Sequence, residues 1–247
     1  NPGEFSVTDQ ITATKSLTGR DLKEGEFSFE LVEGDKVVAT GTNDASGNIT
    51  MGAVKYTEAG KHTYTLREVK GGTTSKGIAY DGKTYTIVTT ITDEGDGTLK
   101  AEHVLKDAKA AEFKNSYNLT PTESSVTDQV KATKFLTGRA LAAGEFSFEL
   151  VEGDKVVATG KNAADGTVVM DKITYDKPGK HTYTLREVRG NVGGITYDAA
   201  TYTIETVVKD NGDGTLGVEH KLKGADEAKF TNSYEPGSKS SSVTDQI

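Results

Sequence analysis

The chain has 247 residues, enough for two domains that each bury a core of their own, and it carries a formal net charge of −8. It contains no cysteine, so neither a disulfide nor a thiolate metal site can stabilise the fold. The acidic balance without a basic block argues against nucleic-acid binding, and no apolar run approaches the ~20 residues of a membrane span.

The sequence contains one module written twice. Residues 25–41 recur letter for letter at 144–160, and residues 61–69 recur at 180–188. The last six residues, 242–247, duplicate residues 6–11. Self-similarity on this scale indicates a tandem array. We therefore expect a first module at 6–118, a linker at 119–124, a second module at 125–235, and a linker with the start of a third repeat at 236–247.

Each copy has the pattern of short strands separated by turn residues. In the first copy, alternating apolar residues predict strands over 7–17, 27–31, 37–38, 62–68, 85–91, 99–105 and 113–117. Clusters of Gly, Asn and Asp at 43–48 and 93–98 predict hairpin turns. Seven to eight short strands in about 110 residues, with no convincing helix, are typical of an immunoglobulin-like sandwich. The predicted fold is all-β, with two such sandwiches in tandem.

Three polar side chains in each copy lie on the apolar side of the strand alternation. In the first copy these are Lys15, Glu68 and Asn115. The second copy repeats them as Lys134, Glu187 and Asn232. Lysine and glutamate are almost never fully buried unless they are paired. We therefore expect the three side chains of each copy to meet inside the sandwich.

Two interpretations of this cluster remain open from the residues alone. The first is a buried Lys–Glu ion pair, although such pairs seldom improve stability over apolar residues of similar volume. The second is a reaction: burial lowers the pKa of a lysine and raises that of a glutamate, so Lys15 can be a neutral amine that attacks Cγ of Asn115. Protonated Glu68 would then hydrogen-bond the amide oxygen and relay a proton to the leaving nitrogen. Ammonia leaves and an isopeptide bond remains.

Four blocks of the first copy, at 15–20, 27–31, 64–69 and 113–117, resemble the streptococcal-type pilin isopeptide linkage domain. This is the CnaB-like module of Gram-positive pilins and adhesin stalks. The resemblance implies self-formed bonds from Lys15 to Asn115 and from Lys134 to Asn232, with Glu68 and Glu187 as the catalytic groups. It also implies autocatalysis once per module rather than enzymatic turnover, and a secreted, cell-wall-anchored protein.

The function that we expect is a structural stalk or shaft segment of a Gram-positive adhesin or pilus. Its partners would be neighbouring repeats of the same chain, and a host ligand would bind at the tip of the parent protein. The sequence shows no sortase signal and no pilin polymerisation motif, which favours an internal segment. The alternative is an adhesin module that binds a host protein or glycan through exposed loops. A secreted hydrolase is a third possibility, but no catalytic set is present.

Other polar residues are interpreted as structural, and we expect neither a metal nor a cofactor. Residues 93–97 and 210–214 resemble calcium loops but lack the full ligand spacing, so hairpin turns are predicted. Four histidines (His62, His103, His181 and His220) are expected to pack or to make strand-end hydrogen bonds. Asp9 and Asp128 are interpreted as solvated strand ends, with a second acid or an inter-domain contact as alternatives.

Overall fold

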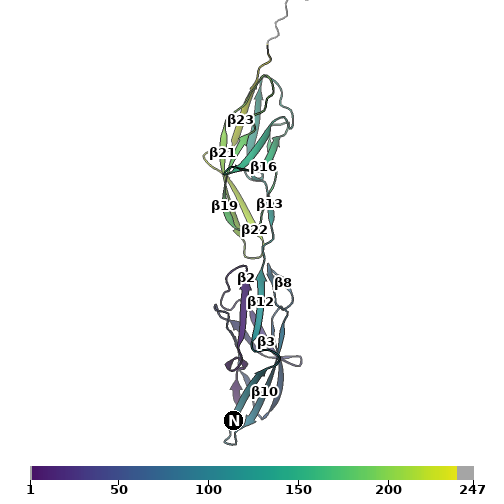
Figure 1. Cartoon of the computed structure of the whole chain (residues 1–247), viewed down its shortest axis with the longest axis vertical. Coiled ribbons are helices and arrows are strands. Elements are labelled where there is room, and N and C mark those ends of the chain that lie inside the picture. Colours follow the sequence, from purple (N-terminus) through teal and green to yellow (C-terminus); the bar gives the residue numbers. More distant parts are fainter. Residues whose placement is uncertain (1, 238–247) are drawn as a thin grey trace, which may run out of the picture. The chain divides into compact units, whose positions relative to one another are not determined.

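The computed structural model describes residues 2–237, and they form two compact all-β units that meet in sequence between Asn118 and Leu119 (Figure 1). The predicted fold class is confirmed. The predicted start of a third repeat falls at 238–247, outside the described residues.

The first unit contains two sheets and a separate strand pair. The larger sheet has the order β11-β10-β7-β3-β4-β5, the smaller has the order β2-β12-β9-β8, and β1 pairs with β6. The strands are β1 (Gly3–Phe5), β2 (Ala13–Thr18), β3 (Ser28–Glu33), β4 (Lys36–Asn43), β5 (Ile49–Met51), β6 (Val54–Tyr56), β7 (Gly60–Glu68), β8 (Thr74–Ser75), β9 (Ile78–Ala79), β10 (Thr84–Asp93), β11 (Leu99–Leu105) and β12 (Ala111–Tyr117).

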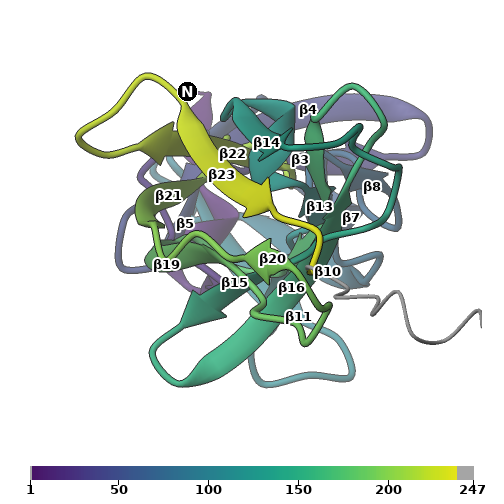
Figure 2. The same ribbon diagram turned by 90° about the horizontal axis from the view of Figure 1, so that it is seen from above.

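The second unit repeats this architecture. Its larger sheet has the order β17-β16-β15-β19-β21-β22, its smaller sheet has the order β14-β23-β20, and β13 pairs with β18. The strands are β13 (Thr122–Ser124), β14 (Ala132–Thr137), β15 (Ser147–Glu152), β16 (Lys155–Asn162), β17 (Val168–Met170), β18 (Ile173–Tyr175), β19 (Gly179–Glu187), β20 (Ile195–Thr196), β21 (Thr201–Asp210), β22 (Leu216–Leu222) and β23 (Ala228–Tyr234). Figure 2 shows β23 between β14 and β20.

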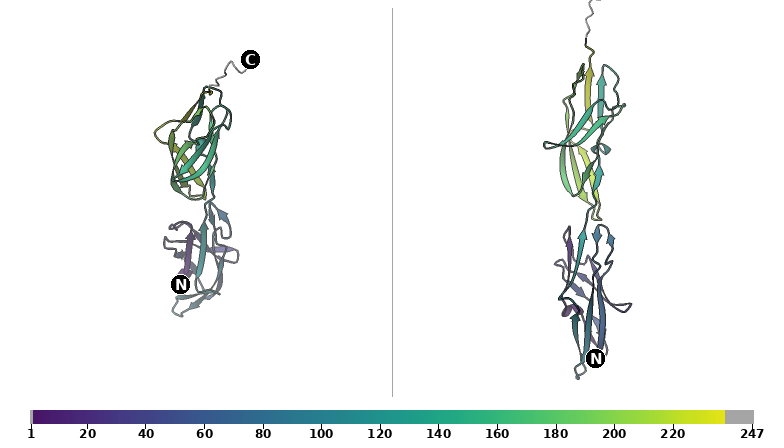
Figure 3. Two further views of the ribbon diagram at one scale, coloured as in Figure 1. Left: turned by 45° about the horizontal axis from the view of Figure 1, so that its top comes forward. Right: turned by 45° about the vertical axis from the view of Figure 1, so that its right-hand side comes forward.

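One strand pairing in each unit is parallel, and it joins the beginning of the module to its end. β2 pairs with β12, and β14 pairs with β23, in the same register. All the other pairings between named strands among the described residues are antiparallel. Two further views show the strands of each unit from other sides (Figure 3). Because the parallel pair joins the beginning of a module to its end, a covalent bond across it would link the two ends of the module.

The core lies between the two sheets and follows the alternation predicted from the sequence. In β7 the inward residues Tyr64 and Leu66 are buried, and the neighbouring strand β3 of the same sheet contributes Phe29 and Leu31. The smaller sheet contributes Phe113, whose ring centroid lies 5.1 Å from that of Phe29. Fully buried rings of this size carry much of the hydrophobic stabilisation of a small domain.

The strand predicted over 7–17 is wrong at its beginning. Residues Val7–Asp9 form a short 3-10 helix, η1, and β2 begins only at Ala13. A capping box explains the difference: the Ser6 side chain accepts from a backbone N–H inside the turn, while the Asp9 carboxylate accepts from the Ser6 N–H. Val126–Asp128 forms the equivalent helix, η2, in which Ser125 is the N-cap and Asp128 completes the capping box. Asp9 and Asp128 are thus helix-capping residues.

The modules also take in residues that the sequence placed outside them. Gly3–Phe5 pairs with β6, although the first module was expected to begin at residue 6. Thr122–Ser124 lies in the expected linker at 119–124, yet it pairs with β18 of the second unit. Both segments are short and have no alternation of their own, so only the neighbouring strand specifies them.

Candidate functional site

The strand register brings the three inward polar residues of the first unit together. Lys15 lies on β2 and pairs with Phe113 of the adjacent parallel strand β12. Asn115 lies on β12 two residues after Phe113. Glu68 ends β7 on the opposite sheet, paired with Phe29. The exposed fractions of Lys15, Glu68 and Asn115 are only 3%, 3% and 2%. The three side chains therefore meet as predicted, and they are buried away from solvent.

The Glu68 carboxylate bridges the amine and the carboxamide. Lys15 Nζ lies 3.1 Å from Glu68 Oε1 and 3.2 Å from Oε2. Asn115 Nδ2 donates a hydrogen bond of 2.7 Å to Oε1. One acid thus contacts both the nucleophile and the nitrogen that would leave, which is the arrangement a proton relay between them requires.

The second unit repeats the cluster with the same connections. Lys134 Nζ donates to Glu187 Oε2 at 2.8 Å, and Asn232 Nδ2 donates to Glu187 Oε1 at 2.7 Å. All three side chains are buried there too. The two units have diverged at many other positions, but the residues that form the cluster and its contacts are the same in both.

Burial favours the uncharged forms of both lysines and of Glu68. It lowers the pKa values of Lys15 and Lys134, although the neighbouring glutamates oppose the shift. It also raises the pKa of Glu68, against the opposing effect of Lys15. Lys15 Nζ lies 4.6 Å from the centroid of the Phe27 ring, and Lys134 Nζ lies at the same distance from Phe146. These rings cover the amines on an apolar side, and the sequence alone did not identify them.

The carboxamide is oriented differently from the sequence-based expectation. Glu68 contacts the amide nitrogen of Asn115, not its oxygen. The oxygen Oδ1 instead accepts a hydrogen bond of 2.7 Å from the main-chain N–H of Asp81. Asn232 Oδ1 accepts from the N–H of Asp198 at the same distance. A loop has no side-chain periodicity, so the only sequence signal for these residues was the Tyr-Asp pair repeated at 80–81 and 197–198.

A glycine turn fixes the backbone of the lysine. The Lys15 N–H donates to the carbonyl oxygen of Gly47 at 2.7 Å. Gly47 has a φ of +89°, and a Cβ added there would lie 2.2 Å from the Lys15 carbonyl oxygen. A Cβ added at Gly166 in the second unit would lie 2.4 Å from the Lys134 carbonyl oxygen. Only glycine permits this approach together with this backbone conformation.

The remaining polar residues have structural contacts. His62 and His181 contact Glu33 and Glu152, while His103 and His220 are buried against threonine hydroxyls. The segment after β10 is a hairpin turn, as predicted, because Asp93 pairs with Leu99 across it. Among the described residues, no three His, Asp or Glu side chains are grouped as metal ligands are, and no helix is long and apolar enough to cross a membrane.

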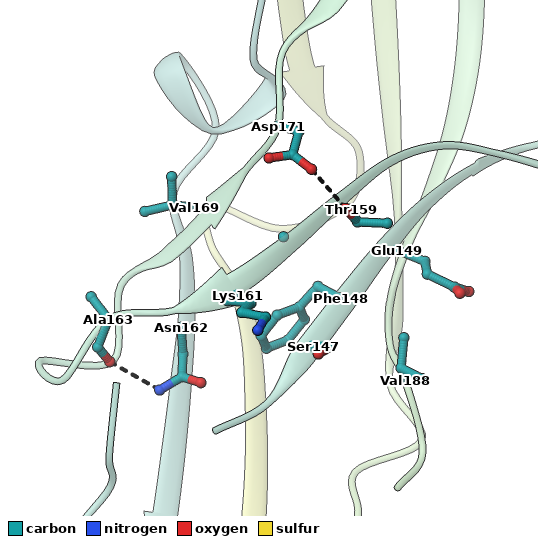
Figure 4. A pocket seen from close by; sticks show the side chains of 11 residues that line it. Ser147, Phe148, Glu149, Thr159, Lys161, Asn162, Ala163, Val169, Asp171 and Val188 are labelled. Atoms are coloured by element: carbon teal, nitrogen blue, oxygen red, sulfur yellow. Dashed lines mark hydrogen bonds between the residues drawn. The ribbon is translucent and has the colours of Figure 1, made fainter. Parts of the chain in front are cut away.

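The ligand-binding alternative needs an exposed surface, and the second unit has an open groove of about 640 Å³ over β15, β16 and β17 (Figure 4). Several of its polar side chains already have hydrogen-bond partners. The Thr159 hydroxyl donates to Asp171 at 2.6 Å, and Glu149 accepts from Arg186. The one aromatic residue in the lining, Phe148, is fully buried. The groove therefore lacks the accessible aromatic anchors that are common at binding hot spots.

Comparison with known proteins gives a match over most of the chain. A family model described as FctA, a Spy0128-like isopeptide-containing domain, matches residues 11–118 and again residues 130–235. No curated protein matches the chain.

Several solved pilin structures are similar at low identity. The major pilin T-13 of Streptococcus pyogenes is 18% identical, with a TM-score of 0.31, over 95% of this chain and 99% of that one. The major pilin T3.2 of the same organism is 17% identical, with a TM-score of 0.31, over 90% and 95%. The shaft pilin SpaA of Lactobacillus rhamnosus GG is 14% identical, with a TM-score of 0.25, over 96% and 100%.

Proposed function

Because the chain belongs to the family of FctA, Spy0128-like isopeptide-containing domains, we propose that each of its modules closes a Lys–Asn isopeptide bond by itself. The first bond joins Lys15 to Asn115 with Glu68 as the acid–base group. The second joins Lys134 to Asn232 with Glu187 in that role. The observation that carries the proposal is the buried carboxylate that contacts both reacting side chains in each unit.

The reaction is an intramolecular transamidation. The neutral Lys15 amine adds its lone pair to Cγ of Asn115, and the bond from Cγ to Nδ2 breaks. One proton passes from Nζ through the Glu68 carboxyl group to Nδ2, and ammonia leaves. The groups are held together, so the reaction needs no second molecule, and fixed orientation can supply ~7–11 kcal/mol of the barrier. Each module reacts once, so this is not enzymatic turnover.

The position of the bond suggests a mechanical role. It would connect β2, at the beginning of the module, with its parallel neighbour β12, at the end. Tension applied through the chain would then pass from Lys15 to Asn115, and the roughly 100 residues between them would carry no load. By the chain-entropy estimate used for disulfides, closing a loop of that length adds about 4.7 kcal/mol of stability. This would reinforce a module that has no cysteine.

We therefore assign the chain to the stalk or shaft of a Gram-positive cell-surface adhesin or pilus, anchored to the cell wall. Neighbouring repeats of the same chain are its partners in this role, and a host ligand would bind elsewhere in the parent protein. The family match supports this assignment, and so does the repetition of one module.

Intact mass spectrometry of the purified chain tests the proposal. A chain with both bonds is lighter by two ammonia molecules than its sequence mass. Lys15→Met, which replaces the amine by an apolar side chain of similar length, should restore one ammonia, and the same change at Lys134 should restore the other. Glu30→Ala, which removes a half-buried acid on β3 that pairs with Arg67, should leave both bonds intact. An unreduced mass in the unmodified chain would refute the reaction.

A binding assay separates the stalk from the ligand-binding alternative. The two-module chain would be passed over immobilised matrix proteins and a glycan array. A stalk segment should bind none of them. Saturable binding that is lost in Val169→Asp, a change within the groove, would favour the adhesin module instead.

A further inference from the structure

The carboxamide that would react is held at both ends by groups with different chemistry. In the first unit, Asn115 Nδ2 donates to the Glu68 carboxylate, and Oδ1 accepts from the main-chain N–H of Asp81, each at 2.7 Å. The second unit has the same two contacts, through Glu187 and Asp198. The acid therefore serves the leaving nitrogen, and a backbone amide serves the oxygen.

We propose that the main-chain N–H groups of Asp81 and Asp198 are the oxyanion donors for isopeptide formation, and that their carboxylates are the positioning groups that hold these donors in place. This inference rests on the proposed function, because it concerns the same reaction. The sequence-based expectation gave the hydrogen bond to the amide oxygen to Glu68, whereas this proposal gives it to a main-chain N–H of a loop.

The electron count shows why a donor is needed on the oxygen. When the Lys15 lone pair forms the bond from Nζ to Cγ, the π electrons of the carbonyl group move onto Oδ1. The oxygen carries a full negative charge until the bond from Cγ to Nδ2 breaks, ammonia leaves with a proton relayed by Glu68, and the carbonyl group re-forms. A donor 2.7 Å from that oxygen is within the range found in oxyanion holes, and it costs no reorganisation as charge develops.

The Asp81 side chain ties this donor to the strand that carries the electrophile. Its Oδ2 accepts from the N–H of Lys114, the residue before Asn115, at 2.8 Å. Its Oδ1 accepts from the N–H of Lys83 at 3.0 Å, which closes the turn. The donor and the carbonyl group are therefore fixed to the same segment of β12. Asp198 makes the corresponding bonds to Thr231 and Ala200.

The same loop also reaches the nucleophile. The ring of Tyr80, the residue before Asp81, packs edge-on against Phe27 with the centroids 5.8 Å apart. Phe27 in turn lies beneath the Lys15 amine. Tyr197 and Phe146 repeat this contact in the second unit. This loop therefore contacts the amide oxygen directly and the amine indirectly, through the Phe27 ring.

The sharpest test removes only the N–H. Cell-free synthesis can place the α-hydroxy acid analogue of aspartate at residue 81, which replaces the amide by an ester and leaves the side chain unchanged. Ammonia loss from each module would be followed over time by mass spectrometry of proteolytic fragments. We expect closure of the first module to slow by about 10²–10³-fold, the cost of removing one oxyanion donor. The second module of the same chain should close at its normal rate.

Side-chain variants provide a second test if the ester chain does not fold. Asp81→Ala removes both ties of the donor and should slow closure of the first module, while Asp81→Asn keeps an acceptor oxygen and should restore much of the rate. Both variants also remove the Asp81 charge, which raises the pKa values of Lys15 and Glu68, so the pH profile of closure should shift alike in the two. The rescue by Asn is therefore the readout: equal closure rates in Asp81→Ala and Asp81→Asn would indicate that Asp81 acts through its charge and not by holding the donor.

The outcomes separate this inference from the proposed function. If the unmodified chain loses no ammonia, the reaction itself is refuted. If the unmodified chain loses ammonia and the ester chain closes equally fast, only the oxyanion donor is refuted. If Asp81→Ala also closes at the normal rate, the positioning role is refuted as well.

Discussion

Asn115→Ala should destabilise the first module far more than the loss of an ordinary buried asparagine does. The variant cannot form the bond, so it loses the roughly 4.7 kcal/mol expected for closing a loop of about 100 residues. It also loses the hydrogen bonds of the carboxamide, at roughly 1–3 kcal/mol for a buried polar group. For a domain of about 100 residues, each 1 kcal/mol corresponds to about 4 °C in Tm, so we expect a decrease of about 20–30 °C.

Asn43→Ala is the matched control. Asn43 is as buried as Asn115, at 2% exposure, and its side chain bonds three backbone groups, of Phe27, Lys23 and Asp44. Its loss removes a carboxamide but no cross-link, so the expected decrease is only about 4–12 °C. Scanning calorimetry of the whole chain measures both, with the second module as an internal reference. Equal decreases in the two variants would refute the reasoning, because the cross-link would then contribute nothing.

Three further predictions follow from other contacts. Ser124→Ala should destabilise the second module by about 1–3 kcal/mol, because it removes the hydroxyl 2.8 Å from Nε2 of buried His220. Chemical denaturation measures this loss, and an unchanged free energy of unfolding would contradict it. Both modules should lose stability as the pH falls below ~6.5, by at most about 1.4 kcal/mol per pH unit for each buried histidine. The reason is that burial lowers the folded-state pKa values of His103 and His220, so the unfolded chain binds protons more readily. His220→Gln should flatten the dependence of stability on pH for the second module only. Gly47→Ala should impair folding and closure of the first module. Gly34→Ala is the control, because Gly34 is also at positive φ but has no atom within 4 Å of the added Cβ, so it should reduce stability much less. Similar masses and Tm values for the two variants would contradict the proposed crowding.

The alternation of apolar residues was sufficient to predict the core and the burial of the three polar side chains in each unit. Lys15, Glu68 and Asn115 each break a regular strand pattern, and strand periodicity assigns a side chain to one face of a sheet without further information. The duplicated module then placed the second cluster. The bridging contacts of Glu68 could not be read from the pattern, because alternation gives a face and not a distance.

Features specified by local hydrogen bonds or by neighbouring strands were missed. The Ser6–Asp9 capping box competes with strand formation, and the expected strand therefore began too early. The segments Gly3–Phe5 and Thr122–Ser124 become strands only because β6 and β18 lie beside them. Asp81 lies in a loop, where no periodicity indicates which group faces Asn115. Except for the capping box, these features depend on contacts that are distant in sequence.

The comparison of the two modules favours the proposed reaction over a simple ion pair. The groove over β16 and β17 has changed between the copies: Lys161, Val169 and Asp171 replace Thr42, Thr50 and Gly52. The residues around the buried amine keep both their identity and their contacts, down to the backbone donor on the amide oxygen. A buried ion pair gains little over apolar residues of similar volume, and it needs no oriented carboxamide. An amine, an acid, an amide and an N–H donor together are what an amide exchange requires, which is why we propose the reaction for this cluster and not a stabilising ion pair.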